Sequence, residues 1–263
     1  MKKIILLLVF PFSFVSFCQT QNLTATVLTN KSLAADTFIG YDGLENLHFV
    51  KNDILFKQST TELWQYRNIS LGKITRVDLQ NPLNIVLFYE NFNTVVLLDN
   101  QLNETQKINF SENNFPINAT ATGIATQNRL WIYNNLTQEI GLFDYLKNTF
   151  QSITPSFQGT FMHYETDFNT FYWIDEKNDL YSCTAFGKIT TMGKLPVFDQ
   201  FQVISSKAVL YKNNTNLFYY TLNDNKSTLI DFDKKTFMKF QYRDQILSIF
   251  TTEGITNFKI ILP

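Results

Sequence analysis

A strand-turn-strand pattern recurs along this chain from Leu44 to Pro263. Apolar and polar residues alternate with a period of two, as in Glu62–Tyr66 and Thr94–Leu98, and clusters of Asn, Asp, Ser and Gly separate the alternating segments. After the first 20 or so residues, no stretch sustains the i, i+3, i+4 spacing of an amphipathic helix. This recurrence restricts the chain to an all-β repeat architecture with almost no helix.

The repeat units have the length of propeller blades. A second strand follows each candidate first strand after a turn, and a third strand follows in every unit except the last. The second strands begin 31 to 47 residues apart, which brackets the length of a four-stranded blade. We therefore predict a six-bladed β-propeller, with five blades as the alternative count and a β-sandwich or open meander as the alternative architecture. The candidate first strands lie near 44–50, 74–79, 121–126, 160–165, 201–205 and 245–250.

A propeller of this kind must close its ring. The last repeat unit ends at Pro263 after two strands, while segments 24–28 and 37–40 near the amino terminus belong to no unit. We expect these amino-terminal segments to complete the last blade. Such pairing hides two sheet edges that would otherwise invite aggregation, and it ties the two ends of the chain together.

The amino terminus has the pattern of a secretory signal. Two lysines precede an apolar run over 4–17, which is shorter than a membrane-spanning helix requires and is interrupted by Pro11. We interpret residues 1–19 as a signal peptide and residues 20–263 as a single propeller domain. The alternative is a lipoprotein in which Cys18 carries the lipid anchor, although Phe17 fits poorly directly before a lipidated cysteine.

Charge and cysteine content limit the classes of partner. The formal net charge is −1, and removal of the leader with its two lysines would make it more negative by two units. No run of Lys or Arg is present that would follow a phosphate backbone, so we expect no nucleic-acid partner, and no later segment is apolar enough to span a bilayer. Without Cys18, Cys183 is the only thiol, so packing of the 26 Phe, 12 Tyr and 3 Trp must stabilise the domain.

No catalytic or cofactor-binding motif is present. Nucleophile elbows, glycine-rich phosphate loops, zinc-binding helices and acidic calcium loops are all absent, so we assign no catalytic residue, no metal ligand and no cofactor. The two histidines, His48 and His163, both fall in predicted first strands, which line the axis of a propeller. His163 shares a strand face with Glu165, which raises the alternative of an acid/base or metal pair in the channel.

Carbohydrate recognition or processing is the alternative function. Paired carboxylates cleave sugars, and Asp78, Glu90 and Asp99 cluster in the sequence of the second unit. Trp64, Trp131 and Trp173 recur at positions that we interpret as equivalent, which favours packing between blades over a role as sugar platforms.

Loops are the best candidates for a binding surface because a rigid scaffold positions them. The loop Gln80 to Asn84 is our predicted partner contact, with Gln80, Asn81 and Asn84 as its polar residues. Phe92 and Phe168 join this set because they lie in turns, where an aromatic side chain escapes packing between blades.

Two further segments carry a resemblance to a known family. Val77–Tyr89 and Phe92–Asn100, together with the start Phe38–Asp42 and the link Leu71–Ile74, resemble a family of exported propeller-like proteins of Bacteroidetes that has no established activity. The resemblance covers most of the mature chain and implies an exported propeller in the periplasm or at the outer membrane. We expect a non-catalytic scaffold that binds an envelope protein partner.

Overall fold

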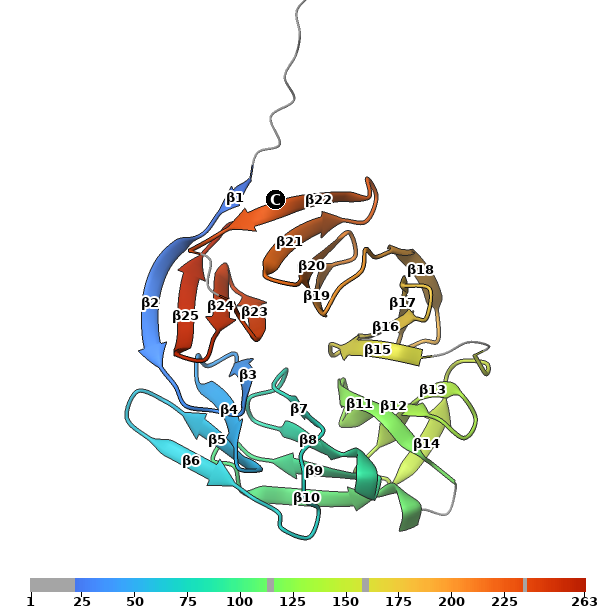
Figure 1. The fold of residues 1–263 in the computed structure, drawn as a ribbon. Coiled ribbons are helices and arrows are strands. Elements are labelled where there is room, and N and C mark those ends of the chain that lie inside the picture. Colours follow the sequence, from blue (N-terminus) through green and yellow to red (C-terminus); the bar gives the residue numbers. More distant parts are fainter. Residues whose placement is uncertain (1–21, 113–115, 158–160, 234–235) are drawn as a thin grey trace, which may run out of the picture.

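Six sheets are arranged around a common axis in the computed structural model, which describes residues 22–112, 116–157, 161–233 and 236–263 (Figure 1). Each sheet contains four antiparallel strands, and one of the six has a short fifth strand at its outer edge. The protein is a six-bladed β-propeller, as the repeat pattern predicts. Two short 3-10 turns, Glu90–Phe92 and Phe110–Glu112, are the only helical elements among the described residues. The predicted signal peptide and Cys18 lie outside the described residues.

Each blade is a meander of adjacent strands that runs from the axis to the rim. Blades 1 to 3 comprise β3 (Thr37–Tyr41), β4 (Leu47–Lys51), β5 (Ile54–Gln58) and β6 (Leu63–Tyr66); β7 (Arg76–Asp78), β8 (Ile85–Tyr89), β9 (Thr94–Leu98) and β10 (Glu104–Asn109); and β11 (Ala119–Ala125), β12 (Arg129–Asn134), β13 (Glu139–Asp144) and β14 (Thr149–Ser152). Blades 4 and 5 comprise β15 (Phe161–Thr166), β16 (Thr170–Asp175), β17 (Asp179–Thr184) and β18 (Ile189–Lys194); and β19 (Gln200–Ser205), β20 (Ala208–Asn213), β21 (Asn216–Thr221) and β22 (Lys226–Asp231).

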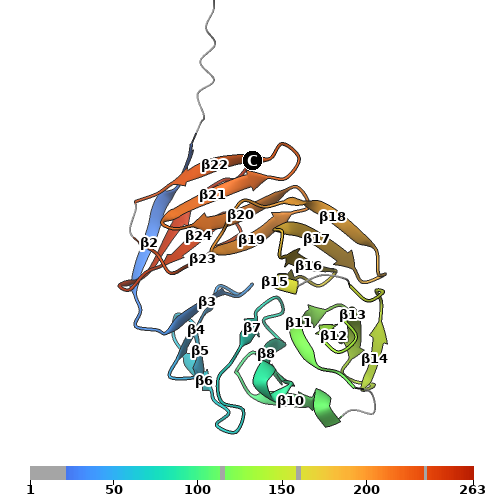
Figure 2. The same ribbon diagram turned by 45° about the vertical axis from the view of Figure 1, so that its right-hand side comes forward.

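The two ends of the chain together build blade 6. Its inner three strands are β23 (Lys239–Arg243), β24 (Ile246–Phe250) and β25 (Gly254–Lys259), and its outer strand is β2 (Thr26–Ser32), which pairs antiparallel with β25. The two-residue strand β1 (Leu23–Thr24) pairs in parallel with β22 of blade 5. Figures 1 and 2 show β1 and β2 following the rim of the ring past two successive blades. Closure by pairing of the two ends is therefore confirmed.

The strand register that we predicted is wrong in blades 1 and 6. The segments 44–50 and 245–250 correspond to the second strands β4 and β24, and the true inner strands are β3 and β23. Segment 37–40 therefore belongs to blade 1, and only the segment that begins near Thr26 completes blade 6. With this correction, the second strands begin 38 to 44 residues apart. The interval of 31 residues that we predicted came from the wrong register in blade 1.

The core lies between blades. All five residues of β8 and all five of β9 are buried, because each blade packs a neighbour on both of its faces. Val86 and Phe88 pack toward Phe143 of blade 3, whereas Ile85 and Leu87 belong to the cluster that includes Leu55 of blade 1. In blade 2, the middle strands are therefore almost entirely apolar, whereas β5 of blade 1 and β17 of blade 4 also contain polar, partly exposed residues.

Tryptophans do not occupy equivalent positions in the blades. Trp131 and Trp173 lie on second strands, whereas Trp64 lies on the outer strand β6. Trp131 is fully buried, and its indole N–H donates to the backbone oxygen of Asp167 at 2.8 Å, so it links blade 3 to blade 4. The packing role that we predicted holds for Trp131 and Trp173, both of which belong to one buried cluster with Cys183.

Removal of residues 1–34 tests the closure. The truncated chain lacks β1 and β2, so the edge of β25 loses its partner and the apolar cluster of Phe232, Phe258 and Ile260 loses its cover. We expect aggregation, or a melting temperature lower by more than roughly 10 °C in circular dichroism. A chain that begins at Asn22 is the control. If the truncated protein were a monomer with the melting temperature of the control, closure by β2 would be dispensable.

Candidate functional site

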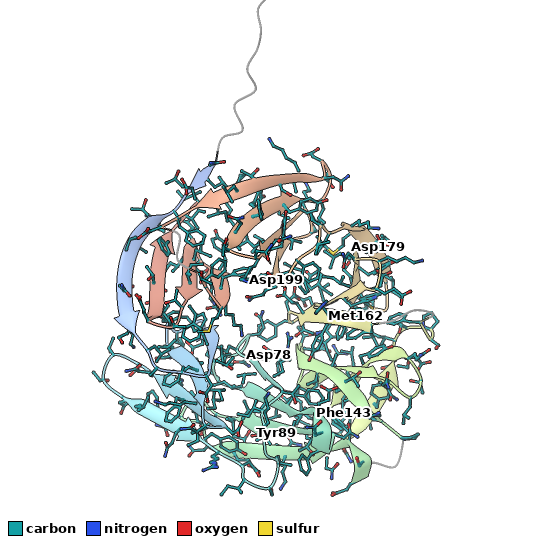
Figure 3. All side chains as sticks on the ribbon, viewed as in Figure 1. Asp78, Tyr89, Phe143, Met162, Asp179 and Asp199 are labelled. Carbon is teal, nitrogen blue, oxygen red and sulfur yellow. The ribbon has the colours of Figure 1, made fainter. Side chains whose placement is uncertain are left out.

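The inner strands of five blades, β3, β7, β15, β19 and β23, contribute residues to the lining of a central cavity of about 990 Å³. It runs the length of these strands, since residues that precede β3 and β7 and residues at the ends of β7 and β23 all line it. Figure 3 shows Asp78 and Asp199 near the centre of the ring, whereas Tyr89 and Phe143 lie farther out among the blades. The volume is at the upper end of the range of small-molecule sites.

Glutamine side chains pair with the backbone of the next blade at this cavity. The amide of Gln241 accepts from the backbone N–H of Tyr41 at 2.6 Å and donates to the backbone oxygen of the same residue at 3.1 Å. Gln200 makes the same pair of bonds to Phe240, and Gln202 makes it to Tyr242. On β3 and β23, side-chain amides thus form the hydrogen bonds that a neighbouring strand would otherwise provide at the inner edge of the sheet.

Carboxylates perform a similar role between other blades. Glu165 accepts from the backbone N–H of Val203 at 2.7 Å and joins blade 4 to blade 5. Asp78 accepts from the backbone N–H of Ile124 at 2.8 Å and joins blade 2 to blade 3. Asp78 also accepts from the backbone N–H of Gln80 at 2.8 Å, so it caps the turn that follows β7.

Blades 2 and 4 also contact each other directly across β11. A Cβ at Gly123 would lie within 3 Å of both the Thr166 hydroxyl and the Asp78 carboxylate, so only glycine leaves room for the 3.4 Å contact between them. Arg76 donates to the backbone oxygen of Tyr164 at 3.2 Å, and its guanidinium lies 4.2 Å from the centre of the Tyr164 ring.

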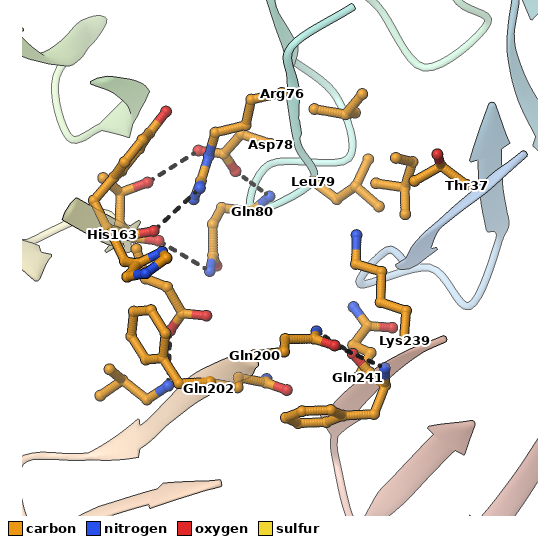
Figure 4. A pocket seen from close by; sticks show the side chains of 18 of the residues that line it. Thr37, Arg76, Asp78, Leu79, Gln80, His163, Gln200, Gln202, Lys239 and Gln241 are labelled. Carbon is orange, nitrogen blue, oxygen red and sulfur yellow. Dashed lines mark hydrogen bonds between the residues drawn. The ribbon is translucent and has the colours of Figure 1, made fainter. Parts of the chain in front are cut away.

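Charged groups in the cavity have shifted pKa values (Figure 4). Burial raises the pKa of Glu165 to about 7, against the opposing effects of the Val203 N–H and the charges of Arg76 and Lys239. Burial also raises the pKa of Asp78. Lys239 shifts in the opposite direction, because burial first and the charge of Arg76 second lower its pKa to about 8.

His163 lies where we predicted, on the inner strand of blade 4 and lining the cavity with Glu165. Its ring contacts Phe198 and Phe201, with ring centroids 5.2 Å and 6.4 Å away, and burial lowers its pKa. Within the described ranges, no group of three or more His, Cys, Asp or Glu side chains is placed to hold a metal ion.

His48 does not line the axis, contrary to our prediction. It lies on the second strand β4, is fully buried, and its Nε2 is 3.0 Å from Asp42, which Lys57 approaches at 3.9 Å. Burial lowers the pKa of His48 despite the adjacent carboxylate, so its imidazole is neutral at pH 7. Burial alone would raise the pKa of Asp42, but hydrogen bonds from His48 and Asn46 outweigh it and lower the value to about 2. This buried cluster is structural.

The three carboxylates considered for sugar chemistry do not meet. Asp78 faces the cavity, and Glu90 is in the turn at the opposite end of β8. Asp99 lies in the loop between β9 and β10, where it accepts from the backbone N–H groups of Gln101 and Asn103. The paired arrangement that glycoside cleavage requires is therefore not formed by these residues.

The predicted contact residues divide between the two ends of the ring. Gln80, Asn81 and Asn84 follow the inner strand β7, whereas the half-exposed Phe92 lies in the turn after β8. Gln80 also lines the cavity and reaches the backbone oxygen of Thr166 at 3.5 Å. Phe168 does not escape packing, because it is partly buried against the cluster between blades 2 and 3.

A group of exposed leucines surrounds the predicted loop, and we call it the leucine patch: Leu44, Leu83 and Leu146, which are 56%, 63% and 68% exposed. The backbone N–H of each leucine donates to an Asp or Asn side chain two residues earlier, at 2.9, 3.0 and 3.1 Å. The loop that bears Leu83 also lies against the other two loops. Asn84 donates to the Tyr145 hydroxyl at 3.0 Å, and a Cβ on Gly43 would lie 4.0 Å from Pro82.

Sequence analysis did not single out these leucines. The available signal was the triplet of Asp or Asn, any residue, then Leu after a strand, as at 42–44, 81–83 and 144–146. Short Asx turns of this kind fix the backbone, but the triplet alone does not identify an exposed leucine, since Leu102 and Leu180 end the same triplet and are buried.

Solved structures with a similar fold are propellers. The chain aligns with virginiamycin B lyase from Staphylococcus aureus at a TM-score of 0.56 and 11% identity, over 92% of this chain and 96% of that one. It aligns with BamB from Moraxella catarrhalis at 0.53 and 9% identity, over 90% and 100%. The propeller domain of Cps50 (Swd1) from Myceliophteria thermophila gives 0.54 and 10%, also over 90% and 100%.

These alignments support the fold alone. No protein-family model matches the chain, and no curated protein matches it. Among the described residues, no helix has the length and apolar character needed to cross a membrane.

Substitution of Gln241 by Leu tests the role of the glutamine bonds. Leucine removes both bonds to Tyr41 at the junction of blades 6 and 1, which leaves a backbone N–H and a C=O without partners. We expect a loss of about 1–3 kcal/mol in the free energy of unfolding, measured by urea denaturation. Gln80→Leu is the matched control, and because its only side-chain bond is 3.5 Å long, we expect a change within about 0.5 kcal/mol. Equal effects of the two substitutions would contradict this interpretation.

Proposed function

We propose that this protein is an exported, non-catalytic propeller that serves as a protein-binding scaffold in a cell-envelope assembly, with the leucine patch as its docking surface. The leucine patch is the observation that carries the proposal. The exposed leucines lie on three loops, of which the one that bears Leu83 contacts the other two, and clusters of exposed apolar side chains mark sites of protein contact.

The loops that bear the patch are held before any partner binds. Asp42 accepts from the backbone N–H groups of both Leu44 and Asn46 at 2.9 Å, and Asp144 accepts from those of Leu146 and Lys147. A surface that is already ordered loses little conformational entropy on association, so more of the apolar contact contributes to affinity. The predicted polar residues Asn81 and Asn84 lie in the same loop as Leu83. They place hydrogen-bonding groups beside the exposed leucine.

The cell-envelope part of the proposal depends on the sequence. The leader-like amino terminus and the resemblance of Val77–Asn100 to exported propellers of Bacteroidetes support export to the periplasm or outer membrane. BamB is one of the solved structures with this architecture, although at 9% identity the likeness extends to the fold only.

The enzymatic alternative has less support. A lyase is among the similar folds, and His163 and Glu165 do share the cavity of this chain. However, Glu165 already accepts a backbone hydrogen bond from the next blade, and the His163 ring packs on two phenylalanines. Both side chains are thus engaged in structural contacts.

Substitution of the patch leucines tests the docking surface. We expect Leu44→Asp, Leu83→Asp and Leu146→Asp, singly and together, to weaken binding of an envelope protein that co-purifies stoichiometrically after crosslinking. A buried hot-spot leucine replaced by a charge should raise the dissociation constant roughly 30-fold or more. Affinity capture with quantitative mass spectrometry, followed by titration with the purified partner, measures the effect.

Leu136→Asp is the matched control. Leu136 is 60% exposed and its N–H donates to Asn134 two residues earlier, so it has the same turn and exposure at the opposite end of its blade from Leu146. The control should retain the partner. Equal loss in the control and the patch variants, or the absence of any stoichiometric partner of the wild-type protein, would rule out the proposed surface.

A further inference from the structure

Lys239 is a cation of the central cavity that has no direct hydrogen bond or ion pair to another described residue, and Glu165 attracts its charge from a longer distance. Its side chain projects from the first residue of β23 into the cavity, which keeps part of it exposed to solvent (Figure 4). Among the described residues, no acid or carbonyl forms a hydrogen bond or ion pair with its ammonium group. An ammonium group that is partly desolvated and unpaired is costly, and an anion at this position would remove that cost.

Neutral hydrogen-bond donors accompany this cation. Gln200, Gln202 and Gln241 each use one amide N–H for the backbone of the next blade, and within the part of the chain that the structure describes no group accepts the second N–H. All three side chains line the cavity. The side-chain oxygen of each glutamine accepts a hydrogen bond from a backbone N–H group, which fixes the plane of the amide. The second amide N–H of each glutamine is therefore already oriented before any ligand enters.

Arg76 is a second cation of the cavity, and it is already engaged. Arg76 donates to the Tyr164 carbonyl and stacks on the ring of the same residue. Some N–H groups of Arg76 are already bonded to Tyr164, but its positive charge still faces the cavity. We therefore expect Arg76 to attract an anion over a longer distance and not to bind it directly.

We propose that the central cavity binds a small carboxylate-bearing molecule, with Lys239 as the ionic anchor and the spare amide N–H groups of Gln200, Gln202 and Gln241 as further donors. This site is separate from the leucine patch. One unpaired ammonium with neutral amides suits a single negative charge, and the acidic side chains in the same cavity would repel a more highly charged phosphate.

Binding should depend on pH because Glu165 shares the cavity. Ionised Glu165 opposes a bound carboxylate, and its pKa is about 7, while Lys239 loses its charge above a pKa of about 8. A rise in pH through both values therefore weakens binding, and acidification below 7 strengthens it. The other titratable or charged side chains that line the cavity are Asp36, Asp53, Lys73, Arg76, Asp78, His163, Tyr164, Asp167, Tyr172, Asp199 and Arg243.

The test measures binding of acetate and D-glucuronate, which each carry a single negative charge, to the folded protein by calorimetry and ligand-observed NMR at pH 6.0 and 7.5. D-Glucose serves as the uncharged counterpart of glucuronate, and inorganic phosphate serves as the competing anion. We expect at least one carboxylate to bind, more tightly at pH 6.0 than at pH 7.5. We also expect Lys239→Met to weaken that binding roughly tenfold or more.

Two further variants make the outcome specific. Glu165→Gln retains an acceptor for the Val203 N–H but stays neutral, so we expect it to bind like the wild type at pH 6.0 and up to roughly fourfold more tightly at pH 7.5. Lys73→Met removes a cation at the mouth of the cavity and should leave affinity nearly unchanged. The proposal fails if no carboxylate binds, if phosphate or glucose binds better than every carboxylate, if Lys239→Met retains full affinity, or if Glu165→Gln shows no gain at pH 7.5.

Discussion

The unpaired inner edge of each blade is the constraint on which the rest of this structure depends. A four-stranded sheet that faces an axis leaves backbone N–H and C=O groups without strand partners at its innermost strand. Side chains from the preceding blade satisfy several of these groups here, through the amides of Gln200, Gln202 and Gln241 and the carboxylates of Asp78 and Glu165. The blades are therefore joined at the axis by polar bonds and farther out by apolar packing.

This arrangement explains why the centre of the ring is polar. Side chains long enough to reach the neighbouring backbone must carry amide or carboxylate groups, and the space they leave is lined with the same groups. Gly123 on β11 has no side chain, and this leaves room for Asp78 and Thr166 to contact each other across blade 3. The cavity is thus narrowed on one side, while Lys239 projects into it from blade 6 without a partner.

Much of the fold is legible in the sequence because the middle strands of each blade are buried on both faces. β8 and β9 are unbroken apolar runs, and the hairpin between them is placed correctly from sequence alone. The sequence pattern does not identify the inner strands β3 and β23 as the first strands of their blades. It places segment 37–40 in the last blade, and it assigns β23, which reads Lys-Phe-Gln-Tyr-Arg with polar residues facing the cavity, to no unit.

The candidate site was less predictable. His48 and His163 have similar sequence surroundings, yet a shift of one strand places the first in the core and the second at the cavity. Gln80, Asn81 and Asn84 were chosen as a polar loop, but the exposed leucines beside them depend on three loops that are distant in sequence. The sequence pattern of a single segment cannot reveal a surface that forms only when loops from three blades come together in the folded ring.

The pairing of β2 with β25 has a consequence for the order of folding. Residues 26–32 pair with residues 254–259, so this contact joins two segments that are more than 220 residues apart in the sequence. Contacts of such separation carry a large loop-closure cost and form late. Until then, five blades and an incomplete sixth present two open edges, and the nascent protein is at its most vulnerable to association with other chains during this interval.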